Sequence, residues 1–379
     1  MSTIYYVVRK QPLKWIAFLF LLLFVYNSAV AQDAKKEDFK PSGKIWGYMF
    51  GDVFYKAGGD TLLFGKSEYA GNEKNAIGAK LRRVYFGYDY NISPKWSTRF
   101  LLETTASTTT PGGNFGVVVK LGYLQYKNVF KFIPNSKLSV GLIPTPVFAF
   151  PEKSRGYRSV EKEALDLRGL GNSVDQGASF EGNFDKKGTS GFTVMIGNGS
   201  GNKPTVGKYL EYYLSVHKKF FKNRLNLEVM LDHKKIDKEL NKTLLRGFVS
   251  YEVPKFRVGI EISPNFIDEK VIVGTQKVEA HTQPLLTSFF ASPKLHKNVW
   301  MFLRYDYLNP DLNYNKDYKY ANTAQNYDEN LFIAGLQIII HEKVNIMPNL
   351  YINTYNKKKD AVVDRKADFV LRTTVYFIF

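Results

Sequence analysis

The sequence of 379 residues contains no cysteine. This absence excludes disulfides, thiolate metal sites and a lipid anchor attached to a cysteine. Histidine is scarce, and none of the five has the spacing to another histidine that metal ligands require; they are His217, His233, His281, His296 and His341. No glycine-rich phosphate loop follows a strand and opens a helix. We therefore expect that the protein is not an enzyme and binds neither a metal ion nor a cofactor.

Long hydrophobic runs are also missing. The longest uncharged apolar stretch, residues 15–25, has 11 residues, whereas a spanning helix needs ~20. This stretch follows the cations Arg9, Lys10 and Lys14 and precedes the small residues 29–31, which suit a cleavage site. We expect residues 1–31 to be a secretory signal peptide and residues 32–42 a short periplasmic lead.

Acidic residues are fewer than basic ones, and the net charge is +18. The expected signal peptide holds three cations and no acid, so the rest of the chain carries +15. Such a balance favours nucleic acid, anionic lipid or anionic solutes as partners, and export makes nucleic acid the least suitable of these. Aromatic residues are abundant, with 25 Tyr and 29 Phe, although the mean hydropathy is −0.26. Membrane β-barrels place such residues in girdles at the lipid–water boundaries.

The dominant pattern is an alternation of apolar and polar residues with period two, which is typical of strands. In residues 225–232, every odd position is leucine or valine, and Asn226, Glu228 and Asp232 lie on the opposite face. Sixteen segments follow this pattern, and most have the ~9–11 residues that cross a bilayer at a tilt. They are residues 44–56, 79–91, 95–106, 116–128, 136–145, 175–184, 189–198, 208–219, 223–233, 242–252, 255–263, 282–292, 297–307, 328–340, 343–353 and 367–379.

The connections between these segments alternate between short and long. Each long connection follows an odd-numbered segment; they are residues 57–78, 146–174, 264–281, 308–327 and 354–366. Short periplasmic turns and long external loops are typical of membrane barrels. The last segment ends on Phe379, like the terminal strand that barrel-assembly machinery recognises; the alternative is an ordinary edge strand of a β-sandwich. We predict an all-β fold, a transmembrane antiparallel barrel of about 16 strands over residues 43–379, in the bacterial outer membrane.

The alternation also predicts which charged residues face the lumen. The predicted cations are Arg83, Arg99, Lys120, Arg246, Arg257, Arg304 and Arg372, and the predicted acids are Asp89, Glu103, Glu211, Glu228, Asp232, Glu261 and Asp306. These charges indicate a wet, polar interior, because Lys or Arg facing lipid costs ~2–4 kcal/mol at mid-bilayer. The alternative interpretation is a set of structural salt bridges without a role in selectivity. Seven cations against seven acids leave this wall neutral, so the excess charge lies in turns and loops.

Residues 141–177 resemble a porin family of Bacteroidetes that is related to the phosphate-selective porins O and P. The resembling residues are Gly141 to Pro146, Glu152-Lys153, Gly156 to Arg158, Val160 to Lys162 and Gly171 to Gly177, with a second stretch from Arg304 to Asp311. The Ala-Val-Ala-Gln junction at residues 29–32 also suits that phylum. The resemblance implies a 16-stranded porin, often a homotrimer, for passive uptake of small solutes. The name of the related family implies that phosphate is the solute, but no phosphate-binding lysine cluster maps onto this chain.

The connection after the fifth segment is the third external loop, which in general porins folds inward and narrows the pore. Residues 159–168 have helical composition, and Gly169 is placed to end a short helix. We predict that this loop and the wall set a mild anion preference, because cations in a narrow passage favour anions. The predicted loop residues are Lys153, Arg155, Arg158, Lys162 and Arg168, and the predicted wall residues are Arg99, Arg304 and Arg372. The alternative is a surface loop with internal salt bridges.

These patterns predict a porin for small hydrophilic or anionic solutes, embedded among outer-membrane lipids. For the lysines of the external loops, binding to lipopolysaccharide phosphates is one interpretation and a solvated surface is another. Two other functions stay open. One is a substrate-specific transporter with a closed lumen, and the other is a structural or adhesive barrel whose loops bind partners.

Overall fold

The computed structural model describes residues 39–379, apart from residues 63–67, 107, 205–206, 319–325 and 359–363. The predicted signal peptide and most of the predicted lead lie outside the described residues. The compact unit Ser42–Phe379 contains every strand that the described residues form. No helix among the described residues is long and apolar enough to cross a membrane.

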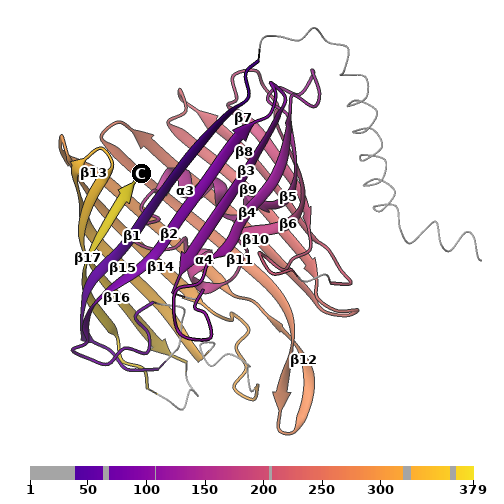
Figure 1. Ribbon diagram of the computed structural model, residues 1–379. Coiled ribbons are helices and arrows are strands. Elements are labelled where there is room, and N and C mark those ends of the chain that lie inside the picture. Colours follow the sequence, from indigo (N-terminus) through magenta and orange to yellow (C-terminus); the bar gives the residue numbers. More distant parts are fainter. Residues whose placement is uncertain (1–38, 63–67, 107, 205–206, 319–325, 359–363) are drawn as a thin grey trace, which may run out of the picture. The chain divides into compact units, whose positions relative to one another are not determined.

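The described residues of this unit form seventeen strands (Figure 1). Their bounds are β1 (Ser42–Gly58), β2 (Ile77–Asn91), β3 (Trp96–Thr105), β4 (Val118–Lys127), β5 (Lys137–Pro144), β6 (Val174–Asn183), β7 (Ser190–Gly197), β8 (Glu211–Phe220), β9 (Leu225–Lys235), β10 (Asn241–Val253), β11 (Phe256–Val273), β12 (Gln276–Thr282), β13 (Leu285–His296), β14 (Val299–Asn309), β15 (Tyr327–His341), β16 (Val344–Lys357) and β17 (Asp368–Ile378).

Sixteen of these strands close into an antiparallel ring, which confirms the predicted barrel and its strand count. β17 pairs with β1, and the backbone of Phe379 exchanges hydrogen bonds of 2.9 and 3.1 Å with Gly47. β12 is the strand outside the ring, because β11 pairs with β13 through its first half and with β12 through its second half. Residues 264–281, predicted as a long connection, thus hold a hairpin that projects beyond the barrel (Figure 1).

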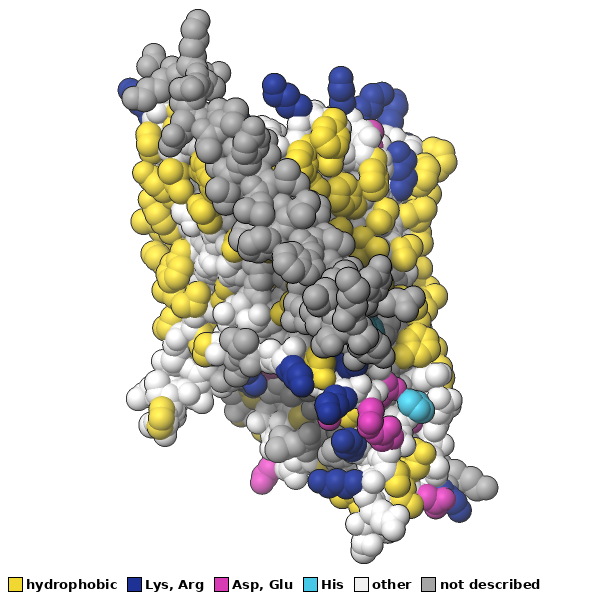
Figure 2. Space-filling view, turned by 90° about the vertical axis from the view of Figure 1, so that its right-hand side faces the viewer, with side chains coloured by type: hydrophobic (Ala, Val, Ile, Leu, Met, Phe, Trp, Pro, Cys, Tyr) yellow, Lys and Arg dark blue, Asp and Glu magenta, His cyan; other side chains and the backbone are white. Residues whose placement is uncertain are grey.

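Side chains alternate between the two faces of the wall as the sequence predicts. In β9, Asn226, Glu228 and Asp232 are buried on the inner face, whereas Val229 is 67% exposed on the outer face. Apolar side chains cover much of the outer surface on the face shown in Figure 2, between its upper and lower edges, and we call this zone the apolar belt. Each of the sixteen strands of the ring pairs with a neighbour on both sides, which is a condition for crossing a lipid bilayer. An even-numbered single-chain barrel with such a belt is an outer-membrane barrel, and this protein lies in a bacterial outer membrane.

The two ends of the barrel differ in the length of their connections. Seven short turns lie at one end, together with the start of β1 and the end of β17, and the long connections lie at the other end. The parity predicted from the sequence is therefore correct. We assign the short-turn end to the periplasm and the long-loop end to the outside.

Candidate functional site

The connection between β5 and β6, residues 145–173, lies inside the barrel, and we call it the inward loop (Figure 1). It contains two short helices, α3 (Pro146–Arg155) and α4 (Ala164–Arg168). The prediction of a short helix here is correct, but its bounds are not. Residues 159–163 are not helical, because the carbonyl oxygens of Ser159 and Val160 accept hydrogen bonds from Arg82 of the wall at 2.8 and 2.7 Å. Gly169, with φ 65°, ends α4 as predicted.

Proline shapes α3 and exposes a backbone acceptor. Pro146 opens the helix, where its missing N–H is not needed. Pro151, inside the helix, cannot donate to the carbonyl of Val147 four residues earlier. Arg246 of β10 donates to that carbonyl instead, and also to Glu228 at 2.5 Å. A wall residue thus completes the hydrogen bonding of the loop helix.

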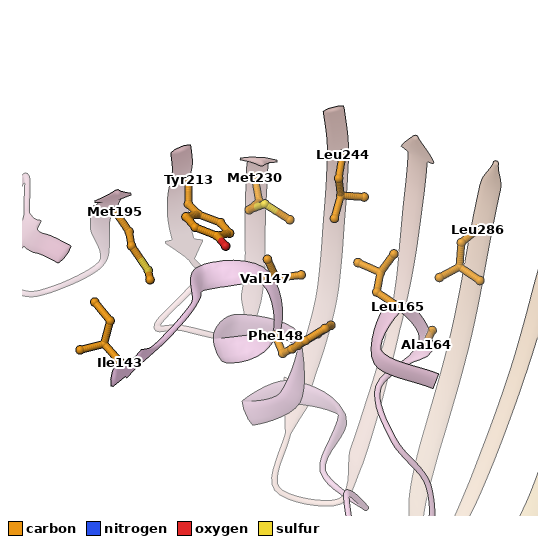
Figure 3. Close-up of a cluster of buried hydrophobic side chains, with 10 residues drawn as sticks. All are labelled: Ile143, Val147, Phe148, Ala164, Leu165, Met195, Tyr213, Met230, Leu244 and Leu286. Atoms are coloured by element: carbon orange, nitrogen blue, oxygen red, sulfur yellow. The ribbon is translucent and has the colours of Figure 1, made fainter. Parts of the chain in front are cut away.

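One apolar side of the inward loop packs against the wall (Figure 3). Val147, Phe148, Ala164 and Leu165 are each at most 5% exposed. Their partners come from β7, β8, β9, β10 and β13 and are Met195, Tyr213, Met230, Leu244 and Leu286. The polar lumen therefore contains an apolar strip that holds the loop on one side, since burying such a side chain contributes about 1.5–3 kcal/mol.

Two arginines attach the loop to β11, β14 and β15, which lie beside β10 and β13 in the ring. Arg155 pairs with Glu163 at 2.5 Å and with Glu261 of β11 at 3.3 Å. Arg168 pairs with Asp306 of β14 at 2.5 Å and with Glu329 of β15 at 2.7 Å. Both side chains are only 4% exposed. Removing one partner of such a buried pair leaves an uncompensated charge and is strongly destabilising.

Arg304 belongs to the same network. Its guanidinium pairs with Asp306 at 2.6 Å, and it also donates to the backbone carbonyl of Lys162 in the inward loop. Asp306 therefore forms ion pairs with two arginines, Arg304 from the wall and Arg168 from the loop. Both of them converge on a carboxylate that is 0% exposed.

A third attachment joins the middle of the loop to β2 and β17. Glu161 lies 3.3 Å from Arg82 and 3.2 Å from Arg372. Arg372 was a predicted wall residue, but Arg82 was not predicted to face the lumen. A β-bulge is the reason, because the β1–β2 register shifts between Phe50 and Gly51, which turns both Arg82 and Arg83 inward. Two adjacent arginines in one strand were the signal that could have revealed it.

The predicted site residues fall into two groups. Arg155, Arg168, Arg304 and Arg372 are buried in ion pairs, with side-chain exposures of 4%, 4%, 8% and 0%. Lys153 and Arg99 are more open: Lys153 is exposed, and Arg99 is 38% exposed and pairs with Asp89 at 2.6 Å. Arg158 is intermediate, at 16% exposed, and pairs with Asp166 at 2.9 Å. Lys162 is half-buried.

Two cavities flank α3 within the lumen. The larger, about 650 Å³, lies between α3 and strands β3 to β9, and Arg99, Lys153 and His217 line it. The smaller, about 420 Å³, is lined by Tyr48, Arg158 and Arg257, among others. Glu152 of α3 borders both cavities. The inward loop therefore divides the part of the lumen near the short turns into two polar compartments.

Two buried glutamates of the inward loop, Glu161 and Glu163, have pKa values shifted in opposite directions. Burial raises the pKa of Glu163 to about 7, although Arg155 and Arg304 oppose the shift and Glu152 and Glu261 add to it. Burial alone would also raise the pKa of Glu161, but Arg82 and Arg372 outweigh it and hold the value at about 2. Glu161 is therefore an anion at neutral pH, whereas Glu163 is close to its titration point.

We expect Glu163 to make the stability of the folded barrel depend on pH. In the folded protein the carboxyl group of Glu163 binds its proton more tightly than in the unfolded chain, where the pKa of a glutamate is about 4.5. Its contribution is therefore fully present below pH 4.5 and is lost as the pH rises through about 7. Urea unfolding in detergent micelles across this range measures it. The difference between the protein and Glu163→Gln should follow this profile, and a difference that does not vary with pH would contradict the assignment.

Among the described residues, no group of three or more His, Asp or Glu side chains is arranged to hold a metal ion. The charged groups of the lumen pair mainly with one another. The chemistry that this arrangement supports is the passage or binding of polar solutes beside α3.

No family model and no curated protein sequence matches this chain. Solved structures do resemble it in fold. The outer-membrane channel DcaP of Acinetobacter baumannii has a TM-score of 0.63 at 13% identity and covers 91% of this chain and 99% of its own. The trimer form of the outer-membrane protein OmpT of Vibrio cholerae has a TM-score of 0.58 at 11% identity, with 90% and 100% covered. An anion-selective porin from Comamonas acidovorans has a TM-score of 0.56 at 10% identity, with 90% and 100% covered. The chain therefore has the fold of bacterial outer-membrane porins.

Proposed function

We propose that this barrel is a porin through which small hydrophilic solutes diffuse passively. The observation that carries the proposal is the pair of polar cavities, about 650 and 420 Å³, on the two sides of α3 within a closed barrel. Lined by charges and hydroxyl groups, these spaces suit hydrated solutes better than apolar ones. The charged inner face costs little free energy when water fills the lumen.

The ion preference that we propose is mildly anionic and rests on the inward loop. Arg155 and Arg168 hold the loop in place, and their charges are offset by carboxylates within 3.3 Å. Lys153 is different, because it is exposed at the larger cavity and has no ion pair among the described residues. Lys153 is therefore the cation that a passing solute meets, with Arg158 in the smaller cavity and Arg99 on the wall as weaker contributors.

Reversing the charge of Lys153 should shift the selectivity toward cations. For Lys153→Glu we expect the anion-to-cation permeability ratio to fall at least about threefold, since one charge ~6 Å from an ion contributes ~0.7 kcal/mol even at the dielectric of water. Reversal potentials under a salt gradient measure the ratio. Lys153→Gln should give an intermediate value. Lys131→Glu, on an exposed turn outside the cavities, is the control and should change the ratio less.

A substrate-specific transporter with a closed lumen is the second candidate. The observation that favours it is the extent of the inward loop, whose buried contacts reach β7 to β10 on one side and β14 to β17 on the other. A loop packed on both sides narrows the space for free diffusion. A structural or adhesive barrel with partner-binding loops is a third possibility, and no feature of the described loops favours it.

Single-channel recording in planar bilayers separates these functions. A porin gives stable ohmic conductance from folded protein, with a reversal potential that favours anions and can be compared with and without phosphate. Folded, heat-modifiable protein that shows no conductance would overturn the open pore and favour the closed transporter. If phosphate does not change the conductance or the reversal potential, the result would contradict the phosphate preference that the family resemblance implies.

Other parts of the proposal concern export and assembly. We propose that residues 1–31 are removed as a signal peptide and that residues 32–42 form a periplasmic lead. A homotrimer is supported by the trimer form of the similar OmpT structure. Kinship with the Bacteroidetes porins related to the phosphate-selective porins is supported by the residues between Gly141 and Gly177. Lipopolysaccharide is the proposed partner of lysines near the outer mouth, such as Lys234, Lys235 and Lys357.

A further inference from the structure

The short-turn end of the barrel carries a ring of positive charge. Its seven turns are residues 92–95, 128–136, 184–189, 221–224, 254–255, 297–298 and 342–343. Each turn has at least one exposed Lys or Arg, nine in all. Their only acids are Asp185 and Glu342. Figure 2 shows such cations along the upper edge of the molecule, above the apolar belt.

These nine cations are not neutralised by neighbouring acids. None of them has an ion pair among the described residues. Asp185 is engaged within its own turn, where it accepts hydrogen bonds from the backbone N–H groups of Thr189 and Ser190 at 3.0 and 2.7 Å. The hydroxyl group of Ser190, together with these backbone bonds and the hydroxyl group of Thr189, lowers the pKa of Asp185. Lys186 and Lys187 are exposed, and neither has an ion pair with Asp185 or with any other described acid.

The other end of the barrel has a different balance. Outside the inward loop, the described parts of the long connections and of the β11–β12 hairpin hold acids and cations in nearly equal numbers. The positive excess of the chain is thus concentrated at the short-turn end. A requirement for solubility alone does not explain a difference between the two ends, because both face water.

Each basic turn is accompanied by an exposed apolar side chain. Within three residues of a cation in every one of the seven turns lies a large apolar residue that is at least 36% exposed. Phe132 is 80% exposed beside Lys131, Phe221 is 72% exposed beside Lys222, and Phe184 is 61% exposed near Lys186. Apolar and aromatic side chains beside snorkelling lysines are typical of positions at the headgroup level of a bilayer.

The turn between β8 and β9 adds a backbone observation. Phe221, Lys222 and Asn223 all have left-handed backbone conformations, with φ values of 52°, 58° and 64°. Bulky side chains rarely adopt this region. The turn closes with a hydrogen bond of 3.0 Å from the Arg224 N–H to the Phe220 carbonyl, and it presents both Phe221 and Lys222 to the outside, where they are exposed.

We propose that this basic rim, the nine cations and their apolar neighbours in the seven short turns, binds the phosphate headgroups of anionic phospholipids in the periplasmic leaflet. The apolar residues enter the acyl boundary, where they continue the belt, and the cations meet the headgroups above it. An acidic soluble protein would account for the cations but not for an apolar side chain in every turn. The proposal does not depend on the channel function.

The test uses the folded full-length protein in phosphatidylcholine vesicles, with spin-labelled phosphatidylglycerol or phosphatidylcholine as the probe. Electron spin resonance gives the relative association constant of each lipid with the barrel surface. We expect phosphatidylglycerol to be preferred at least about twofold on average, because a headgroup that meets one lysine gains up to about fivefold. In 1 M salt the preference should largely disappear, since the Debye length is then about 3 Å.

Two matched variants locate the effect. The rim variant Lys186→Gln, Lys187→Gln, Lys222→Gln and Arg224→Gln neutralises two neighbouring turns and should lower the preference. The control variant Lys203→Gln, Lys208→Gln, Lys238→Gln and Lys277→Gln neutralises four exposed cations at the opposite end and should leave it unchanged. No preference in the unaltered protein, a preference insensitive to salt, or an equal loss in both variants would overturn the proposal. If the rim variant does not fold, the salt series on the unaltered protein still decides.

Discussion

Replacing Asp306 by asparagine is expected to lower the free energy of unfolding by about 3–5 kcal/mol, the range for breaking a buried ion pair. Asp306 is 0% exposed and lies 2.5 Å from Arg168 and 2.6 Å from Arg304. The amide leaves two buried guanidinium groups with one carboxylate fewer. It also weakens the attachment of α4 to the wall, so the inward loop should exchange amide hydrogens faster and the channel conductance should rise.

Asp89→Asn is the matched control for this variant. Asp89 also pairs with an arginine of the wall, but both side chains are about one-third exposed, and such pairs contribute only about 0–1 kcal/mol. Urea unfolding in micelles and hydrogen exchange of residues 156–169 measure the difference. Equal effects of the two substitutions would mean that Asp306 does not hold the loop.

Replacing Arg246 by methionine should have the second large effect. Arg246 is 1% exposed, pairs with Glu228 at 2.5 Å and donates to the Val147 carbonyl that Pro151 leaves without a helical partner. Methionine fills part of the volume but leaves a buried carboxylate and a backbone acceptor without a donor. We expect a loss of about 3–5 kcal/mol in the free energy of unfolding and a looser α3.

A second substitution separates the two contributions of Arg246. Glu228→Gln in the Arg246→Met background removes the unpaired carboxylate, so it should recover part of the stability. The lost bond to Val147 remains, so hydrogen exchange in residues 146–155 should stay fast in the double variant. Full recovery of both stability and protection would show that the contact with Val147 contributes little.

The wall of this barrel could be predicted from the sequence because each strand is recognised from the alternation of its own neighbouring residues. Strand alternation such as that of residues 225–232 follows from one face meeting lipid and the other meeting water. The parity of the connections follows from the barrel itself, since every second turn returns to the same side. The strand count was correct for these reasons, even though β11 and β12 extend beyond the wall.

The interior could be predicted only in part, because it depends on contacts between distant residues. Arg155, Arg168 and Arg304 were predicted to face the lumen, as were the acids Glu261 and Asp306. Which acid pairs with which arginine could not be predicted, because the partners Glu163, Glu261, Asp306 and Glu329 come from four different segments. Arg82 was missed because a bulge changes the phase of β2, and a strict period of two cannot reveal a bulge. The helix at residues 146–155 was missed because its two prolines are atypical of helices, and its stability depends on Arg246 and the apolar strip.

The most direct test of the account asks whether the inward loop stays in place while the channel conducts. Ser154 of α3 and Ser250 of β10 have hydroxyl oxygens 3.2 Å apart, and the chain has no other cysteine to interfere. In the variant Ser154→Cys and Ser250→Cys, a disulfide should form readily and fix α3 to the wall. We predict the same single-channel conductance before and after reduction, with the two single variants as controls. Conductance that appears only after reduction would contradict the account, because the loop would then have to leave the lumen for the pore to open.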